Sequence, residues 1–240
     1  MMAGHSKWNN IKNRKGAQDA KRGKIFQKLS REIYMAAKQG DDPTMNPGLR
    51  LALEKAKSAN VPNDVVNRAI DKATGAGEDE NYEEVVYEGY GPNGVAVLVY
   101  CLTDNRNRTA PNIRVAFTRN GGNLGSSGSV SYMFDRKGLI MIERTEETDE
   151  DMIMLTALEA GAEDIQSSEE GFEIITDASD FLQVKNALEE EGIELASADV
   201  EMVPSMHTTI DEENAETFEK LIDALEDDDD VQNVYHNAEG

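Results

Sequence analysis

Residues 138–203 read GLIMIERTEETDEDMIMLTALEAGAEDIQSSEEGFEIITDASDFLQVKNALEEEGIELASADVEMV. Short apolar runs in this block are typical of strands, and apolar residues that recur every three or four positions are typical of helices. Gly161 and Gly192 follow the two helical patterns and predict where the helices end. In order, we predict strand 139–142, helix 149–159, strands 162–167 and 172–176, a helix that carries Phe181, Val184 and Leu188 inward, and strand 195–202. The order βαββαβ is that of a ferredoxin-like lobe.

A less complete set of elements lies on either side of this block. Before it we predict strands 85–90 and 95–103 around a Gly-Pro-Asn-Gly turn, a helix near 112–119 and a strand at 129–134. After it, Thr209 and Glu212 have the spacing of a capping box before a helix, and a strand follows at 231–235. A terminal piece of about 35 residues cannot bury a core of its own. We therefore expect it to complete the middle lobe, which lacks a second helix and a further strand.

The first part of the chain predicts only helices. Apolar residues from Ile25 to Ala37 lie on one helix face before Gly40, a second helix begins at Asn46 and Pro47, and a third runs from about Asn63 to Gly75. A polar, glycine-containing stretch at 75–82 separates these helices from the first strand. The expected fold is α+β and multidomain: a helical bundle at 1–76, a discontinuous α/β domain at 83–134 plus 205–240, and an inserted ferredoxin-like domain at 135–204.

Charge is divided very unevenly along the chain. Residues 1–72 carry fifteen Lys and Arg against seven Asp and Glu, a balance of +8, and the rest carries nine against forty, a balance of −31, which together give the net −23. Such a division indicates a basic end for gripping a polyanion and an acidic body. Cys101 is the only cysteine and no run is apolar enough to span a membrane, so we expect a cytoplasmic protein.

The highest density of cations lies between residues 7 and 31, where they are opposed only by Asp19. Lysine and arginine at this density suit contacts with phosphates, and a tryptophan among them could stack on an exposed base or ribose. The alternative is a solvated basic helix face, with the tryptophan packed against the bundle. The candidate nucleic-acid-binding residues are Lys7, Trp8, Lys12, Arg14, Lys15, Lys21, Arg22, Lys24, Lys28 and Arg31.

A second group of candidates lies where the second strand passes into the next helix. A helix N-terminus offers free backbone N–H groups to an anion, so a secondary phosphate site is one interpretation of this group. The other is that its polar residues cap and turn the chain beside ordinary surface arginines. The residues are Asn105, Arg106, Arg108, Thr109, Arg114 and Arg119.

The remaining patterns favour no chemistry. The glycine-rich residues 121–128 match neither nucleotide-loop motif, and the three histidines are too scattered for a metal site. We read Asp227 to Asp230 as a solvated acidic turn. No catalytic residue, cofactor, metal or small-molecule substrate is expected, and a monomer is favoured.

Several separated segments resemble the YebC family. They are GHSKWNNIKNRKGAQDAKRGKIFQKLSREI at 4–33, YEGYGPNGVAV at 87–97, LTDNRNRT at 102–109 and GGNLGSSGSVSYMF at 121–134. The resemblance extends over essentially the whole chain, although Asn13 stands where the family often has histidine. It implies three domains, a helical bundle and two ferredoxin-like α/β lobes, with the last inserted into the middle one. It also implies a regulator of gene expression, because the family includes probable DNA-binding transcriptional regulators and a mitochondrial translational activator.

Three functions stay open at this point. The leading one is a non-catalytic DNA-binding regulator of transcription. The first alternative is a translation factor that binds ribosomal RNA and relieves stalling at proline-rich sequences, as the resemblance also implies. The second is an adaptor whose acidic lobes bind a basic protein. No helix-turn-helix, zinc finger or aromatic RNA-binding signature decides between DNA and RNA.

Overall fold

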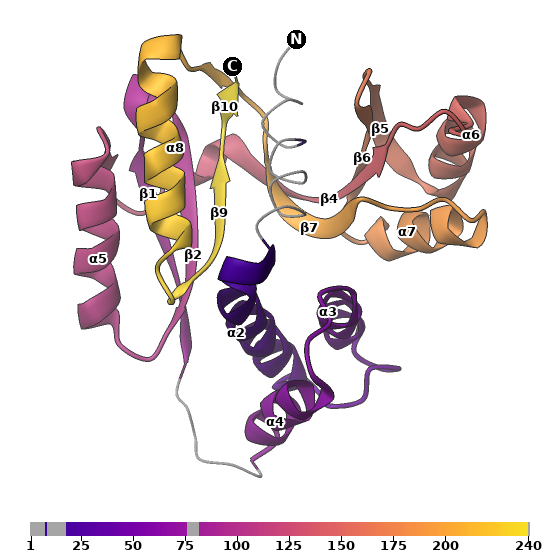
Figure 1. Ribbon diagram of the computed structural model, residues 1–240, viewed down its shortest axis with the longest axis horizontal. Helices are drawn as coiled ribbons and strands as arrows, with labels where there is room; N and C mark the ends of the chain where they lie inside the picture. The colour runs from indigo at the N-terminus through magenta and orange to yellow at the C-terminus, as the bar shows by residue number, and fades with distance from the viewer. Residues whose placement is uncertain (1–7, 9–17, 76–81, 240) are drawn as a thin grey trace.

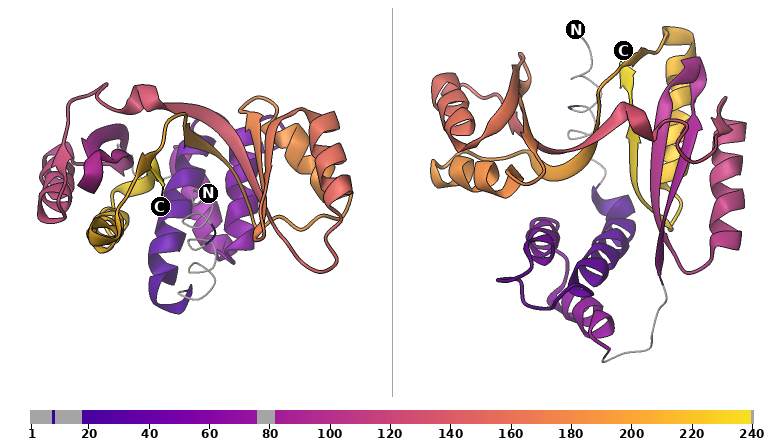
Figure 2. Two further views of the ribbon diagram at one scale, coloured as in Figure 1. Left: turned by 90° about the horizontal axis from the view of Figure 1, so that it is seen from above. Right: turned by 180° about the vertical axis from the view of Figure 1, so that it is seen from behind.

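The computed structural model describes Trp8, residues 18–75 and residues 82–239. Three lobes surround a central region, as Figure 1 shows: a helical lobe at the bottom, a lobe with α5 and α8 on the left, and a lobe with α6 and α7 on the right. The two further views show the same separation of the lobes (Figure 2). The predicted α+β, multidomain class is confirmed.

The first lobe contains helices α2 (Gln18–Ala37), α3 (Pro47–Ser58) and α4 (Asn63–Ala73). Asn46 caps α3 as predicted, because its side-chain oxygen accepts a hydrogen bond from the backbone N–H of Leu49 at 3.0 Å. Ile33, Leu49 and neighbouring alanines form a buried core between the three helices. The small alanine side chains allow the three helices to pack closely around this core.

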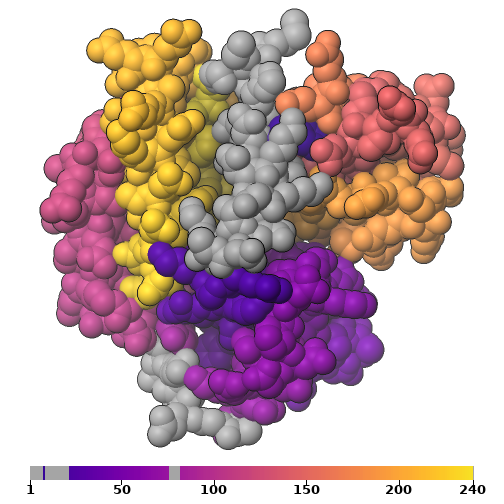
Figure 3. Space-filling view, in the orientation of Figure 1, coloured from indigo at the N-terminus to yellow at the C-terminus, as the bar shows by residue number. Residues whose placement is uncertain are grey.

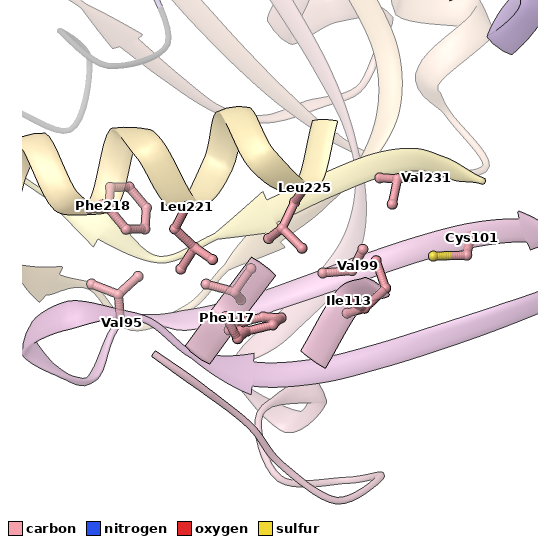
Figure 4. Close-up of a cluster of buried hydrophobic side chains, with 10 residues drawn as sticks. Val95, Val99, Cys101, Ile113, Phe117, Phe218, Leu221, Leu225 and Val231 are labelled. Carbon is pink, nitrogen blue, oxygen red and sulfur yellow. The ribbon is translucent and has the colours of Figure 1, made fainter. Parts of the chain in front are cut away.

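The middle lobe is a four-stranded antiparallel sheet with the order β3-β1-β2-β9. Its strands are β1 (Glu83–Tyr90), β2 (Ala96–Thr103), β3 (Asn123–Leu124) and β9 (Val231–His236). Helices α5 (Arg106–Arg119) and α8 (Glu212–Glu226) cover one face. Figure 4 shows Ile113 and Phe117 of α5 meeting Leu221 and Leu225 of α8 over this sheet. The C-terminal segment therefore contributes a helix and a strand to this core.

The third lobe has the predicted βαββαβ order. It contains β4 (Phe134–Glu143), α6 (Glu150–Ala160), β5 (Ala162–Ser167), β6 (Gly171–Asp177), α7 (Phe181–Glu190) and β7 (Ser197–Pro204). The strand order β5-β6-β4-β7, with every pair antiparallel, is that of a split βαβ unit. The pairings favour the division at residues 135–204, which we keep as a proposal.

Strand β4 is longer than predicted, strand β7 lies two residues later than predicted, and together they join two lobes. They pair from Phe134 opposite Pro204 to Met141 opposite Ser197, and the Phe134 end packs with Leu98 of β2. In Figure 1 this ribbon runs from the middle lobe into the third. The charged Asp-Arg-Lys triplet at 135–137 interrupts the apolar pattern, which is why the sequence predicted only the inner part of β4.

The strand predicted at 129–134 is wrong. Ser131–Met133 is a short 3₁₀ helix, and the third strand of the middle sheet is β3. The buried carboxylate of Glu88 holds this segment in a turn, because it accepts hydrogen bonds from the backbone N–H groups of Gly128 and Ser131. Burial would raise the pKa of Glu88, but these hydrogen bonds outweigh it and lower that pKa.

Two helix starts also differ from the predictions. Helix α5 begins at Arg106, not near Asn112, and tolerates Pro111 in its second turn. A proline there removes one backbone hydrogen bond and usually marks a boundary, which explains the late predicted start. Helix α8 is capped by Asp211, whose carboxylate accepts from the N–H of Asn214 at 2.9 Å, and not by Thr209. Thr208–Thr209 instead forms the short strand β8, which pairs in parallel with β10 (Ala238–Glu239).

Cys101 provides a test of this core. Its side chain is 3% exposed, and burial raises the pKa of the thiol to about 12. At pH 8 the folded protein should therefore keep this thiol protonated and inaccessible, so Ellman's reagent should not react with it over minutes. In guanidinium chloride one thiol per chain should react. Fast reaction of the folded protein would contradict the position of β2 in the core.

Candidate nucleic-acid interface

The predicted basic segment is only partly described by the structure. Lys7, Lys12, Arg14 and Lys15 lie outside the described residues, as does the side chain of Lys21. Arg22 is exposed, and its guanidinium lies 5.7 Å from the centre of the Phe26 ring. No ion pair to Arg22 occurs within the described part of the chain. Its guanidinium group is therefore available to contact a ligand.

Farther along α2, the cations point to the middle lobe. They meet residues 226–230, the last residue of α8 and the four aspartates that follow it, which we name the acidic turn. The Nζ of Lys24 donates to the carbonyl oxygen of Asp227 at 2.8 Å and lies 3.2 Å from its carboxylate. One turn later, the Nζ of Lys28 donates to the carbonyl oxygen of Glu226 at 2.8 Å. Figure 3 shows the C-terminal segment in yellow against α2 in indigo.

Arg31 continues this row of contacts in a more buried position. Its guanidinium donates to the carbonyl oxygen of Asp229 and lies 3.8 Å from the carboxylate of Asp230. The same group lies 5.1 Å from the centre of the Tyr82 ring, a cation–π geometry. Only 12% of the Arg31 side chain is exposed, so it belongs to the contact between lobes.

The end of α8 explains why three cations gather there. The last carbonyl groups of a helix carry partial negative charge and lack partners within the helix. Helix α8 has no basic residue in its last turn, and four aspartates follow it. Cations from α2 supply the missing positive charge. This corrects two expectations: Lys24, Lys28 and Arg31 do not simply face solvent, and Asp227 to Asp230 are not merely a solvated turn.

Asp230 is the buried centre of this contact. Its carboxylate is 3% exposed and accepts hydrogen bonds from the Nη2 of Arg108 and the Oγ1 of Thr109, each at 2.8 Å. The hydroxyl oxygens of Thr109 and Thr103 lie 2.7 Å apart, within hydrogen-bond distance. Together with Arg31, these groups neutralise and satisfy a carboxylate that would otherwise be costly to bury.

The second predicted group therefore divides into structural and exposed members. Asn105 caps α5 by accepting from the N–H of Arg108 at 3.2 Å, and Thr109 is fully buried. Arg106 pairs with Glu83 at 2.7 Å. The predicted capping alternative is thus correct for Asn105, and the hydrogen bonds to Asp230 and Asp104 raise the pKa of Arg108 above its ordinary value.

Two members of that group remain available. Arg114 and Arg119 are exposed on the outer side of α5, and no acidic partner approaches either one among the residues that the structure describes. They do not gather at the N-terminus of α5, where we had placed the phosphate site.

An open groove of about 610 Å³ lies between α2 and the start of α5. Five aspartates line it, at positions 104 and 227–230, against the cations Lys24, Arg31 and Arg108. Because acids outnumber bases, the groove is electrostatically unsuited to a phosphate backbone. We therefore do not place the interface in it.

Trp8 is neither exposed to solvent nor packed against the helical bundle. Its side chain is 1% exposed and packs on Leu139 and Met141 of β4, in the third lobe. In this arrangement its ring cannot stack on a base, which corrects the expected role. The alternative position was also wrong, because the partner is a sheet and not the bundle.

The first lobe contacts the third lobe as well. Lys55 of α3 lies 2.5 Å from the carboxylate of Asp199, and Lys185 of α7 lies 2.9 Å from that of Glu54. Burial would lower the pKa of Lys55, but Asp199 and Glu32 outweigh it and raise that pKa. The helical lobe is thus held by ion pairs on two sides.

One feature of the sequence could have predicted the contact between α2 and the acidic turn. A helix whose last turn lacks any cation, followed by four aspartates, needs positive charge from elsewhere. The supply lies about two hundred positions earlier, where sequence spacing gives no hint of it.

Two kinds of feature are absent from the described residues. No helix in residues 18–75 or 82–239 is long and apolar enough to cross a membrane. Nor does that part of the chain bring three side chains together in a way that could hold a metal ion.

Comparison with known proteins gives a consistent result over the whole chain. Residues 6–76 match the model of the TACO1/YebC protein N-terminal domain, and residues 82–238 match that of the TACO1/YebC second and third domain. A probable transcriptional regulatory protein of Enterococcus faecalis is 63% identical, over 99% of both chains. One from Listeria monocytogenes is 59% identical, again over 99% of both. The crystal structure of a conserved hypothetical protein from Aquifex aeolicus has a TM-score of 0.83 at 48% identity, covering 92% of this chain and 91% of that one.

The contact centred on Asp230 can be tested by substitution. Asp230→Ala removes the hydrogen-bond acceptor of a buried hydroxyl and of the Arg108 guanidinium, and the ion-pair partner of Arg31. The free energy of unfolding measured in urea should therefore fall by roughly 2 to 4 kcal/mol. Asp229→Ala is the matched control, because Arg31 contacts its backbone oxygen and its side chain is exposed. The control should stay within about 0.5 kcal/mol of the unsubstituted protein. Equal stability of both variants would show that Asp230 does not hold the lobes.

Proposed function

The chain belongs to the TACO1/YebC family, and from that premise we propose that it is a non-catalytic regulator of gene expression that binds DNA. Its relatives in Enterococcus and Listeria carry the name probable transcriptional regulatory protein. We place its action in the cytoplasm. Its ligand in this proposal is the phosphate backbone, contacted without reading of bases.

The observation that carries the proposal is the excess of positive charge before residue 23. Once Lys24, Lys28 and Arg31 are assigned to the acidic turn and to Asp230, six cations of the basic segment remain, and Asp19 is the only acid among them. They are Lys7, Lys12, Arg14, Lys15, Lys21 and Arg22. Phosphate contacts by such groups release counterions and so provide affinity that does not depend on sequence.

The acidic character of the other lobes is compatible with this proposal. At physiological salt the Debye length is about 8 Å, so acids a lobe away repel a bound duplex only weakly. Among the nearer acids, Asp227 is paired with Lys24 and Asp230 with Arg108. Arg114 and Arg119 stay proposed as secondary contacts.

Salt dependence gives a direct test. Six phosphate contacts predict a log-log slope of affinity against salt of about −5 on duplex DNA. The triple substitution Lys12→Gln, Arg14→Gln and Lys15→Gln should reduce the magnitude of that slope by about 2.7, because three contacts are lost. Fluorescence anisotropy with a labelled duplex at four or more salt concentrations measures both slopes.

A matched control removes three exposed cations elsewhere. Arg50→Gln, Lys57→Gln and Arg136→Gln change the net charge by the same amount, and these three side chains are exposed outside the basic segment. This control should keep the original slope. If both triple variants change the slope equally, only net charge matters and the assignment of the interface is wrong.

The ribosomal alternative can be tested with the same labelled protein. Unlabelled duplex DNA and purified ribosomes are added as competitors at one fixed salt concentration. We expect duplex DNA to compete at least as well per mole of binding site. Displacement by ribosomes at concentrations at which duplex has no effect would favour ribosomal RNA as the ligand instead.

A further inference from the structure

Trp8 occupies a defined position on the third lobe. Along β4, Ile140 and Ile142 face the core under α6 and α7, while Leu139 and Met141 point to the opposite face of the sheet. Trp8 covers that opposite face and is itself 1% exposed. The part of this sheet face around Leu139 and Met141 is thus covered by a residue from the N-terminal part of the chain.

Gly171 at the start of β6 makes room for the indole ring. A Cβ atom at this position would lie 2.6 Å from the Cη2 of Trp8 and 2.0 Å from the carbonyl oxygen of Ile142. Neither distance is possible for a real side chain, so the close approach of the ring depends on a glycine. The Nε1 of Trp8 finds no hydrogen-bond acceptor among the described residues, so apolar packing holds the ring.

The chain is also fixed on the other side of the basic segment. Helix α2 begins at Gln18 and is held through Lys24 and Lys28 on the acidic turn. Lys12, Arg14 and Lys15 therefore lie in sequence between Trp8 and the start of α2, which are ten residues apart.

We propose that Trp8 is a positioning residue that tethers the basic segment to the third lobe and so presents its cations to nucleic acid. This inference rests on the proposed function. A segment attached at both ends loses less conformational freedom when it binds than a free arm does. The tether therefore raises affinity without adding a phosphate contact.

The tether and the cations predict different effects on the same measurement. Removing a cation flattens the salt dependence, because fewer counterions are released. Removing the tether leaves the number of phosphate contacts unchanged, so affinity should fall at every salt concentration while the slope stays the same. A role of Trp8 in folding alone would change neither quantity in the folded protein.

The first experiment compares the full chain with Trp8→Ala, Trp8→Phe and Tyr132→Ala on a duplex of about 30 base pairs. We expect Trp8→Ala to bind DNA about five- to tenfold more weakly with an unchanged slope. The reason is that losing preorganisation lowers affinity without removing a phosphate contact. Trp8→Phe should recover most of the affinity, because a smaller ring still fills the position. Tyr132 is 69% exposed and lies outside the Trp8 contact, so its substitution is the matched control and should have no effect.

A second variant keeps the only tryptophan as a fluorophore and disturbs what it packs on. Ala196 packs against the Trp8 cluster, so Ala196→Gln should displace the ring. We expect a red shift of its emission together with weaker DNA binding. Displacement of the ring with unchanged affinity would overturn the inference, as would equal affinity of Trp8→Ala and the unsubstituted protein. If the unsubstituted protein itself fails to bind, the proposed function is wrong and this inference falls with it.

Discussion

The carboxyl-terminal end of α8 needs positive charge that its own sequence does not supply, and α2 provides it. Lys28 donates to the last carbonyl group of α8, Lys24 to that of the capping residue Asp227, and Arg31 to that of Asp229. Within the acidic turn, the buried carboxylate of Asp230 is neutralised from two lobes at once. Because a buried, singly paired carboxylate is costly, this network fixes the helical lobe on the middle lobe. The position of α2 follows from that contact.

Local patterns predicted most of the elements but not the contacts between them. The βαββαβ order, the cap at Asn46 and the helix end at Gly161 depend on residues a few positions apart, so they were predicted correctly. The outer half of β4 was missed because its charged residues cross between lobes, and the start of α5 was missed because Pro111 resembled a boundary. The candidate site was less predictable. A count of cations cannot distinguish Lys24, which meets an aspartate two hundred residues away, from Arg22, which faces solvent.

In the structure, the later cations of the basic segment contact other lobes. The proposal assigns the earlier cations to phosphate contacts. Trp8 also has a structural position, because its ring packs on the sheet of the third lobe and not on a ligand. A fixed scaffold and a charged segment attached to it at two points would give tight, sequence-tolerant binding, which suits a regulator that is named for transcription in its relatives.

Hydrogen–deuterium exchange with and without duplex DNA tests this division most directly, because it follows both parts in one experiment. The account predicts slower exchange of backbone amides in residues 6–22 when DNA is bound, and unchanged exchange in residues 226–230. Faster exchange in the acidic turn would mean that DNA takes Lys24 and Lys28 away from it, and unchanged exchange in residues 6–22 would mean that DNA binds elsewhere. Either result would contradict the separation of structural and ligand-binding cations on which the proposed function depends.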